Sequence, residues 1–259
     1  MFARICKVFF LSGIIQIKKR NQLIVEILMK KILFIGNSHT YMNDMPKLVR
    51  LMMENVTNED CEVFMLAYSN RSLKWHMDEE YFSERFNILR GGFDYCVIQE
   101  QAHPLTSMED TEKYTGRIIE MCGKAGTVPV IFETWAEKAK PENQAEMNRR
   151  YRKIAGEQNV LLAHVGEVWE KVRPVLEELS GADLYYSDGA HASSTGDYLA
   201  AMVIVKTITG KLPDESFRTS FDFTLQGDEW QPVKEDVTDE PVQLPEDEVK
   251  IIRKFADFC

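Results

Sequence analysis

Five short apolar runs alternate with helical stretches along the sequence, and this alternation constrains the fold more than any other feature. The apolar runs occupy residues 32–35, 61–67, 95–98, 128–132 and 160–163. The stretches between them carry apolar residues at three- and four-residue spacing, as amphipathic helices do. A repeated strand–helix pattern predicts a parallel sheet with helices on both faces. We therefore expect an α/β protein, a three-layer α/β/α sandwich around a five-stranded parallel sheet.

The alternating pattern ends at about residue 212. We expect residues 29–212 to form one domain, because a segment of this length is enough for one hydrophobic core. Residues 213–259 are more acidic and less regular. They are expected to form a peripheral C-terminal extension that packs on the domain and ends in a helix over residues 245–258.

Residues 1–28 precede the first strand and do not fit this pattern. Their apolar run is shorter than the roughly 20 residues that span a bilayer. Lys18, Lys19 and Arg20 follow the run, where a signal peptide would have its cleavage site. Met29 directly precedes the first strand, as an initiating methionine would. We expect residues 1–28 to be a disordered leader or an upstream extension from a misassigned start.

Composition argues against several classes of function. The 259 residues include 31 Lys and Arg against 41 Asp and Glu, which gives a net charge of −10. A chain this acidic, without a basic patch, is a poor partner for nucleic acids or anionic membranes. The five cysteines show no CxxC spacing, so we expect reduced thiols in a cytoplasmic protein, without disulfides or zinc. The sequence contains no glycine-rich phosphate loop, and no cofactor is predicted.

Ser38 is a candidate nucleophile because of its position. It follows the first apolar run, in Gly36-Asn37-Ser38-His39, where a buried strand leads into a tight turn and then a helix. Such a turn exposes a hydroxyl and brings backbone N–H groups close to a developing oxyanion. Most serines in such positions are only cap or turn residues, and the position of Ser38 by itself does not exclude that alternative. The motif is not GxSxG, so an α/β-hydrolase elbow is not indicated.

Asp188 and His191 are the candidate partners of such a serine. An aspartate three residues before a histidine, on a loop that contains glycine, can reach back to Nδ1. Nε2 would then face the nucleophile and act as the base. The alternatives are a turn aspartate with a surface histidine, or two metal ligands. No third ligand is evident from the spacing, so no metal site is predicted.

Together these features resemble the SGNH (GDSL-type) hydrolase family. The resemblance covers about residues 31–212. The first family block corresponds to Ile35-Gly36-Asn37-Ser38, with Asn37 where many members have aspartate, and the last block to Asp188-Gly189-Ala190-His191. The resemblance implies a flavodoxin-like sandwich and a serine hydrolase that cleaves esters. It also implies that Ser38 is the nucleophile, His191 the general acid and base, and Asp188 its orienting partner.

Two blocks depart from the family pattern. The second block normally supplies a glycine of the oxyanion hole, but the loop here reads Ser69-Asn70-Arg71-Ser72. Asn70 is expected to replace the glycine, because asparagine tolerates a left-handed backbone. The third block normally supplies an asparagine from GxND, whereas the third strand here ends in Gln99-Glu100-Gln101. Either glutamine offers a side-chain amide. We favour Gln101, which completes a predicted oxyanion hole with Ser38 and Asn70.

Five residues near these blocks are predicted to contact substrate: Asn37, His39, Gln99, His103 and Trp135. They lie on segments that follow strands, and such segments meet at one edge of a parallel sheet. Trp135 suits a platform on which a sugar stacks, although a tryptophan at a strand end is more often part of the packing. His76 and His164 are expected to be structural histidines.

The favoured function is a serine esterase or deacetylase that hydrolyses a small O-acyl ester, and the resemblance suggests carbohydrate esters. Its partner would be a small-molecule ester, not a nucleic acid or a membrane. One alternative is an acyltransferase on the same scaffold, which a drier pocket and poor hydrolysis of simple esters would indicate. The other is a non-catalytic binding protein with a decayed site. The missing glycine favours that reading, and the retained Ser38, Asp188 and His191 oppose it.

Overall fold

A computed structural model describes residues 29–78, 82–221 and 242–257, so the expectation for residues 1–28 lies outside the described residues. Five strands form one parallel sheet in the order β2-β1-β3-β4-β5. The strands are β1 (Lys30–Gly36), β2 (Cys61–Ala67), β3 (Tyr95–Ile98), β4 (Val128–Phe132) and β5 (Leu161–Ala163). The predicted five-stranded parallel sheet is confirmed, and its strand order is that of the flavodoxin-like folds.

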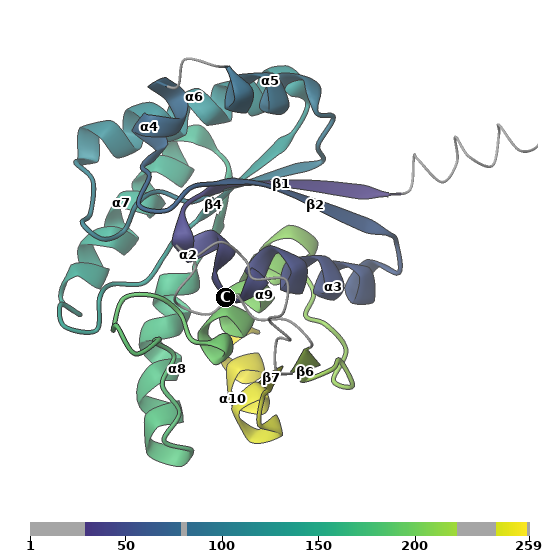
Figure 1. Ribbon diagram of the computed structural model, residues 1–259, viewed down its shortest axis with the longest axis vertical. Helices are drawn as coiled ribbons and strands as arrows, with labels where there is room; N and C mark the ends of the chain where they lie inside the picture. Colours follow the sequence, from purple (N-terminus) through teal and green to yellow (C-terminus); the bar gives the residue numbers. More distant parts are fainter. Residues whose placement is uncertain (1–28, 79–81, 222–241, 258–259) are drawn as a thin grey trace, which may run out of the picture.

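Helices cover both faces of the sheet, which gives the expected three layers (Figure 1). One layer consists of α4 (Leu73–Asp78), α5 (Ser83–Arg90), α6 (Met108–Ala125) and α7 (Asn143–Gln158). The other consists of α3 (Met45–Thr57), α8 (Val165–Leu179), α9 (Ser194–Thr209) and α10 (Glu246–Ala256). The short α2 (Ser38–Tyr41) and a 3₁₀ turn, η1 (Met42–Asp44), connect β1 to α3.

The strand sequences are continuously apolar because each face of the sheet meets its own hydrophobic core. On β1, Ile32 and Phe34 are buried against α3, α8, α9 and α10. Leu33 and Ile35 are buried against α4 to α7 on the opposite face. Full burial of a side chain of this size contributes about 1.5–3 kcal/mol. The two cores therefore fix the sheet, and the sheet fixes the loops at its carboxyl edge.

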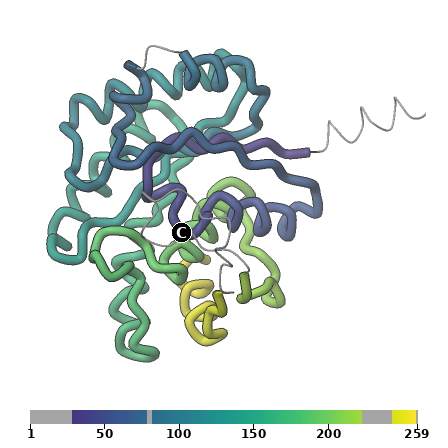
Figure 2. The backbone as a smooth tube through the Cα atoms, in the orientation of Figure 1, coloured from purple at the N-terminus to yellow at the C-terminus, as the bar shows by residue number. Residues whose placement is uncertain are grey.

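The C-terminal segment contributes to one of these cores. Two short strands, β6 (Ser220–Phe221) and β7 (Val242–Gln243), pair antiparallel. The tube in Figure 2 shows α10, in yellow, beside the green α9, and α10 packs against both α8 and α9. Its Ile252 is fully buried in that core. The boundary at residue 212 stays a prediction.

The arrangement of the strands places a ligand-binding edge next to β1. Because β1 lies between β2 and β3, the strand order reverses at this point. In open α/β sheets, ligands bind at such a reversal, outside the carboxyl ends of the strands. The loops that follow β1, β2 and β3 all leave from this edge. None of the helices in the described ranges has the length and apolar character needed to cross a bilayer.

Candidate active site

Ser38 lies in the sharp turn that leaves the carboxyl end of β1. It is the first residue of α2, and Asn37 caps this short helix by accepting a hydrogen bond from the His39 N–H at 3.1 Å. Gly36 makes the turn possible. A Cβ at this position would lie 2.4 Å from Gln99 Oε1 and 2.4 Å from Thr40 Oγ1. Neighbouring side chains therefore pack directly against the turn and fix the position of Ser38.

His191 and Asp188 lie on the loop between α8 and α9. Asp188 Oδ1 accepts hydrogen bonds from the N–H of Ala190 at 2.9 Å and from the N–H of His191 at 3.0 Å. Gly189 has a φ of 71°, which allows the loop to turn back on itself within three residues. The Gly189 carbonyl also accepts a hydrogen bond from the Lys138 N–H at 2.8 Å. The segment after β4 thus anchors the loop from outside.

A chain of hydrogen bonds joins Ser38, His191 and Asp188. Ser38 Oγ lies 2.8 Å from His191 Nε2, and His191 Nδ1 lies 2.5 Å from Asp188 Oδ2. An ionised carboxylate only accepts hydrogen bonds, so it holds the imidazole proton on Nδ1. Nε2 is then free to accept the hydrogen of the serine hydroxyl. This is the arrangement of a nucleophile, a base and an acid that orients the base.

Asp188 and two further histidines set the charge around His191. Partial burial acts to raise the pKa of Asp188, but hydrogen bonds from the His191 ring and from two backbone N–H groups outweigh it and lower that pKa. Burial lowers the pKa of His39 well below its usual range and lowers the pKa of His103 to about 4. Asp188 is therefore ionised at neutral pH, whereas both neighbouring histidines are neutral.

His103 should make the stability of the fold depend on pH. Its pKa of about 4 in the folded protein lies below the value of about 6.5 for a histidine in an unfolded chain. Between these values the unfolded chain binds more protons and is favoured. We expect the contribution of His103 to be fully present above pH 6.5 or so and to be lost as the pH falls toward 4. Urea denaturation across this range should show a shallower decline for His103→Gln than for wild type. Parallel declines would contradict this expectation.

Asn70 has the left-handed backbone that the sequence led us to expect, with a φ of 54°. Its turn is closed by a hydrogen bond from the Arg71 N–H to the Tyr68 carbonyl at 3.1 Å. Asn37 Nδ2 donates to the Arg71 carbonyl at 3.1 Å and ties this turn to the turn that carries Ser38. Within the described ranges, the backbone N–H groups of Ser38 and Asn70 have no hydrogen-bond acceptor. Both donors are therefore available to an oxygen of a ligand.

The two glutamines after β3 occupy different environments. Gln101 Nε2 donates to Asn70 Oδ1 at 3.1 Å, so its amide lies beside the Asn70 turn. Gln99 is 1 % exposed, and its Oε1 accepts from the Asn37 N–H at 2.8 Å and from Thr40 Oγ1 at 3.0 Å. Gln99 therefore supports the turn that carries Ser38. Its side chain is enclosed in this structure, and the predicted contact with substrate stays a prediction.

Glu100, between these glutamines, connects the loops after β2 and β3. Its Oε1 accepts hydrogen bonds from the N–H of Leu73 at 3.0 Å and of Gln101 at 2.7 Å. Burial raises the pKa of its carboxyl group, and Oε2 has no hydrogen-bond partner among the described residues. Three consecutive side chains at the end of β3 thus hold three segments: the Ser38 turn, the start of α4 and the Asn70 turn.

Asn37 and Trp135, which were predicted to contact substrate, are also enclosed. Both ends of the Asn37 amide are engaged by the backbone, as described above, and the side chain is buried. Trp135 is 0 % exposed and stacks on Trp169, with ring centroids 4.1 Å apart. Its Nε1 donates to the Ala190 carbonyl at 2.8 Å, so it supports the loop that carries His191.

His39 and His103 lie close to His191. The ring centroid of His39 is 4.8 Å from that of His191 and 5.0 Å from that of His103. His39 is buried, whereas His103 is only partly buried. Of the five residues predicted to contact substrate, His103 is therefore the least buried, and its contact with substrate stays a prediction.

Glu133, His164 and Glu167 have the spacing of metal ligands, with their ligand atoms all within 4.8 Å of one another. They already form ion pairs: His164 Nδ1 lies 3.3 Å from Glu133 Oε2 and 3.2 Å from Glu167 Oε1. Arg152 also pairs with Glu167. The hydrogen bond to Glu133 raises the pKa of His164. This network connects the end of β4 to α8 and contains none of the candidate catalytic residues.

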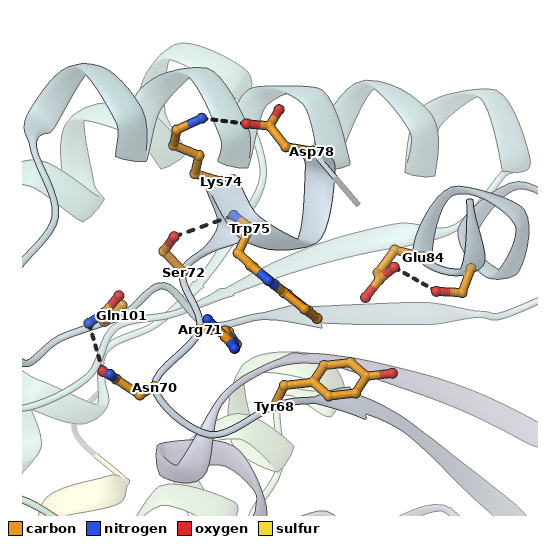
Figure 3. A pocket seen from close by; sticks show the side chains of 10 residues that line it. Tyr68, Asn70, Arg71, Ser72, Lys74, Trp75, Asp78, Glu84 and Gln101 are labelled. Carbon is orange, nitrogen blue, oxygen red and sulfur yellow. Dashed lines mark hydrogen bonds and ion pairs between the residues drawn. The ribbon is translucent and has the colours of Figure 1, made fainter. Parts of the chain in front are cut away.

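A pocket of about 800 Å³ adjoins Asn70 and Gln101 (Figure 3). Tyr68, Arg71 and Trp75 form part of its wall. None of these three was predicted from the sequence as a site residue. The one signal that the sequence offers is the pair of aromatic residues on either side of the polar loop after β2.

Comparisons with solved structures identify proteins of the same fold. A protein from Slackia heliotrinireducens described as "a putative SGNH hydrolase" is 27% identical, with a TM-score of 0.57, over 70% of this chain and 99% of that chain. A lipase/acylhydrolase from Enterococcus faecalis is 18% identical, with a TM-score of 0.55, over 72% and 99%. The psychrotrophic esterase EstA from Pseudoalteromonas sp. is 11% identical, with a TM-score of 0.52, over 70% and 97%. Neither a protein-family model nor a curated protein matches the sequence.

The resemblance indicated by the sequence motifs is confirmed: the fold is that of the SGNH-type (GDSL-like) hydrolases, and the solved structures that share it include a lipase/acylhydrolase and an esterase, which act on ester bonds. The two more distant neighbours support the fold alone. The assignment of Gln99-Glu100-Gln101 to the third family block stays a prediction.

Proposed function

We propose that this protein is an esterase that hydrolyses small O-acyl esters. Ser38 is the nucleophile, His191 the general acid and base, and Asp188 the residue that orients His191. The observation that carries the proposal is the hydrogen-bond chain from Ser38 Oγ through His191 to Asp188, with distances of 2.8 Å and 2.5 Å. Its position at the carboxyl edge of a hydrolase-type sheet supports the same conclusion.

In the proposed reaction, Ser38 Oγ attacks the ester carbonyl while His191 Nε2 accepts its proton. The negative charge on the tetrahedral oxygen is stabilised by the N–H groups of Ser38 and Asn70 and by the Gln101 amide, once that amide turns from Asn70 Oδ1. His191 then donates its proton to the leaving alcohol. Water, activated by His191, hydrolyses the acyl-enzyme and restores the hydroxyl of Ser38.

The alcohol part of the ester is proposed to be a carbohydrate. The pocket next to Asn70 offers two partly exposed aromatic rings, those of Tyr68 and Trp75. Polar side chains, among them Ser72 and Gln101, lie along the same wall. Aromatic faces together with hydrogen-bonding groups suit a ring that carries hydroxyls.

Labelling with a fluorophosphonate probe tests the catalytic assignment without knowledge of the substrate. The probe needs only an activated serine and an oxyanion hole, and peptide mass mapping locates it. We expect modification of Ser38 in the wild-type chain, and none in Ser38→Ala or His191→Ala. Ser194→Ala, which removes a serine at the start of α9, is the matched control and should label normally. A folded wild-type chain that does not react would count against the esterase assignment.

Substitutions at Asn70 should separate the role of its backbone from the role of its side chain. Glycine adopts a positive φ without strain, so Asn70→Gly should keep the N–H in place and retain activity close to wild type. Valine in this conformation costs roughly 1–2 kcal/mol, and a displaced N–H should lower kcat by about 10²-fold. Hydrolysis of phenyl acetate would measure both variants. If the glycine and valine variants lost the same activity, the side-chain amide of Asn70, and not its backbone N–H, would be responsible.

A further inference from the structure

The pocket beside Asn70 and Gln101 contains a cation that has no anionic partner among the residues that the structure describes. The Arg71 guanidinium lies over the Trp75 ring, 5.0 Å from its centroid. Within the described ranges, its N–H groups form neither a hydrogen bond nor an ion pair. The other cation of the pocket, Lys74, differs in this respect. It forms an ion pair with Asp78 and donates a hydrogen bond to Tyr114 Oη at 3.3 Å.

The acidic groups that line the same pocket are already engaged. Asp78 pairs with Lys74 and lies 3.9 Å from Arg117. Glu84 accepts hydrogen bonds from Ser83 and contacts the buried ring of His76. Neither carboxylate pairs with Arg71, although both lie along the same wall. Among the described residues, no acidic group therefore compensates the positive charge of Arg71, in a chain whose net charge is −10.

Two aromatic rings stand next to this cation. Tyr68 is 42 % exposed and Trp75 is 37 % exposed, and their ring centroids are 5.1 Å apart. Figure 3 shows Arg71 between these rings and the hydrogen-bonded pair of Asn70 and Gln101. A guanidinium that lies over an aromatic face keeps its N–H edge free, and that edge matches the paired oxygens of a carboxylate or phosphate.

We propose that this pocket binds the ring-bearing half of the ester and that the ring carries an oxyanion group, a carboxylate or a phosphate. Arg71 binds the anion, and Trp75 and Tyr68 contact the ring. The proposal rests on the proposed esterase function, because the pocket begins at the residues assigned to the oxyanion hole. An acidic protein repels anionic substrates in general, so selection for such an ester depends on Arg71 itself.

The test compares pairs of aryl acetates that differ only in charge. The first pair is 4-acetoxybenzoate and 4-acetoxybenzamide, and a second pair has one further CH₂ between ring and charge. 4-Acetoxyphenyl phosphate distinguishes phosphate from carboxylate as the preferred anion. For the full chain, we expect kcat/KM to favour an anionic ester over its neutral partner by about tenfold, the scale of a charge-assisted hydrogen bond. In Arg71→Gln this ratio should fall to about one. In Lys74→Gln, the matched control, the ratio should stay above one.

Binding to Ser38→Ala gives a readout that does not depend on turnover. Calorimetric titration with 4-acetoxybenzoate and 4-acetoxybenzamide should show the same preference, and Arg71→Gln in this background should remove it. Hydrolysis of both esters without a preference would overturn the assignment of the pocket and leave the esterase function intact. Preferential binding without hydrolysis would overturn the esterase function and support the anion site. A preference that survives Arg71→Gln but is lost in Lys74→Gln would also overturn the assignment.

Discussion

Replacing Asp188 by asparagine should lower kcat for ester hydrolysis by about 10⁴-fold, although the two side chains have nearly the same shape. The reason lies in how Asp188 is held. Its Oδ1 accepts hydrogen bonds from the N–H groups of Ala190 and His191. In the variant these donors retain the amide oxygen, so the NH₂ group faces His191 Nδ1. Nδ1 must then accept, the ring proton moves to Nε2, and His191 can no longer take the proton of Ser38.

Asp183→Asn is the matched control for this experiment. Asp183 lies on the same loop, accepts a hydrogen bond from the Tyr185 N–H at 3.1 Å and pairs with Lys138 at 2.5 Å. The ion pair is exposed, and neither contact involves Ser38 or His191, so activity should remain near wild type. Circular dichroism would establish that both variants are folded. A loss of less than tenfold in Asp188→Asn would show that the orientation of His191 does not depend on this carboxylate.

Replacing His76 by leucine should lower the free energy of unfolding by about 3–5 kcal/mol, the usual effect of breaking a buried polar pair. His76 is fully buried, with Nε2 2.8 Å from the Gly36 carbonyl oxygen and Nδ1 3.0 Å from Glu84 Oε1. A carbonyl only accepts, so Nε2 carries a hydrogen. Leucine removes both bonds.

His164→Leu provides the comparison in urea denaturation. His164 also contacts carboxylates, but its side chain is 32% exposed, so its loss should cost only about 1 kcal/mol. Because Gly36 precedes the Ser38 turn, His76→Leu should in addition slow the reaction of Ser38 with the fluorophosphonate. Equal losses of stability in the two variants, or an unchanged rate of labelling, would contradict the role assigned to His76.

The fold could be predicted from the sequence because the strands follow a simple rule. Runs such as 32–35 are apolar at every position since both faces of the sheet are covered, and this signal does not depend on distant residues. Gly210 acts in a similarly local way, because its φ of 73° ends α9 with a backbone that glycine adopts without strain. The Asn70 turn also has the backbone that its residue type favoured.

The direction of individual side chains could not be predicted in the same way. Topology dictates which loops meet at the carboxyl edge, and it therefore located the segments that carry Ser38 and His191. It does not decide whether a side chain on such a loop faces a ligand or supports its neighbours. Gln99 and Trp135 support neighbouring loops. The place of Arg71 depends on how α4 sets Trp75 against the Asn70 turn, and no local pattern encodes that distance.

Glu100, whose Oε2 has no hydrogen-bond partner among the described residues, affects stability and catalysis in opposite directions. Because burial raises the pKa of this carboxyl group, the ionised form is less favourable in the folded chain than in the unfolded chain, and neutral pH retains this cost in full. The same side chain holds the start of α4 and the Gln101 N–H in register. Laboratory evolution for thermal tolerance would therefore have to remove this cost while keeping an acceptor for the Leu73 and Gln101 N–H groups, and turnover would decline in variants that lose that acceptor.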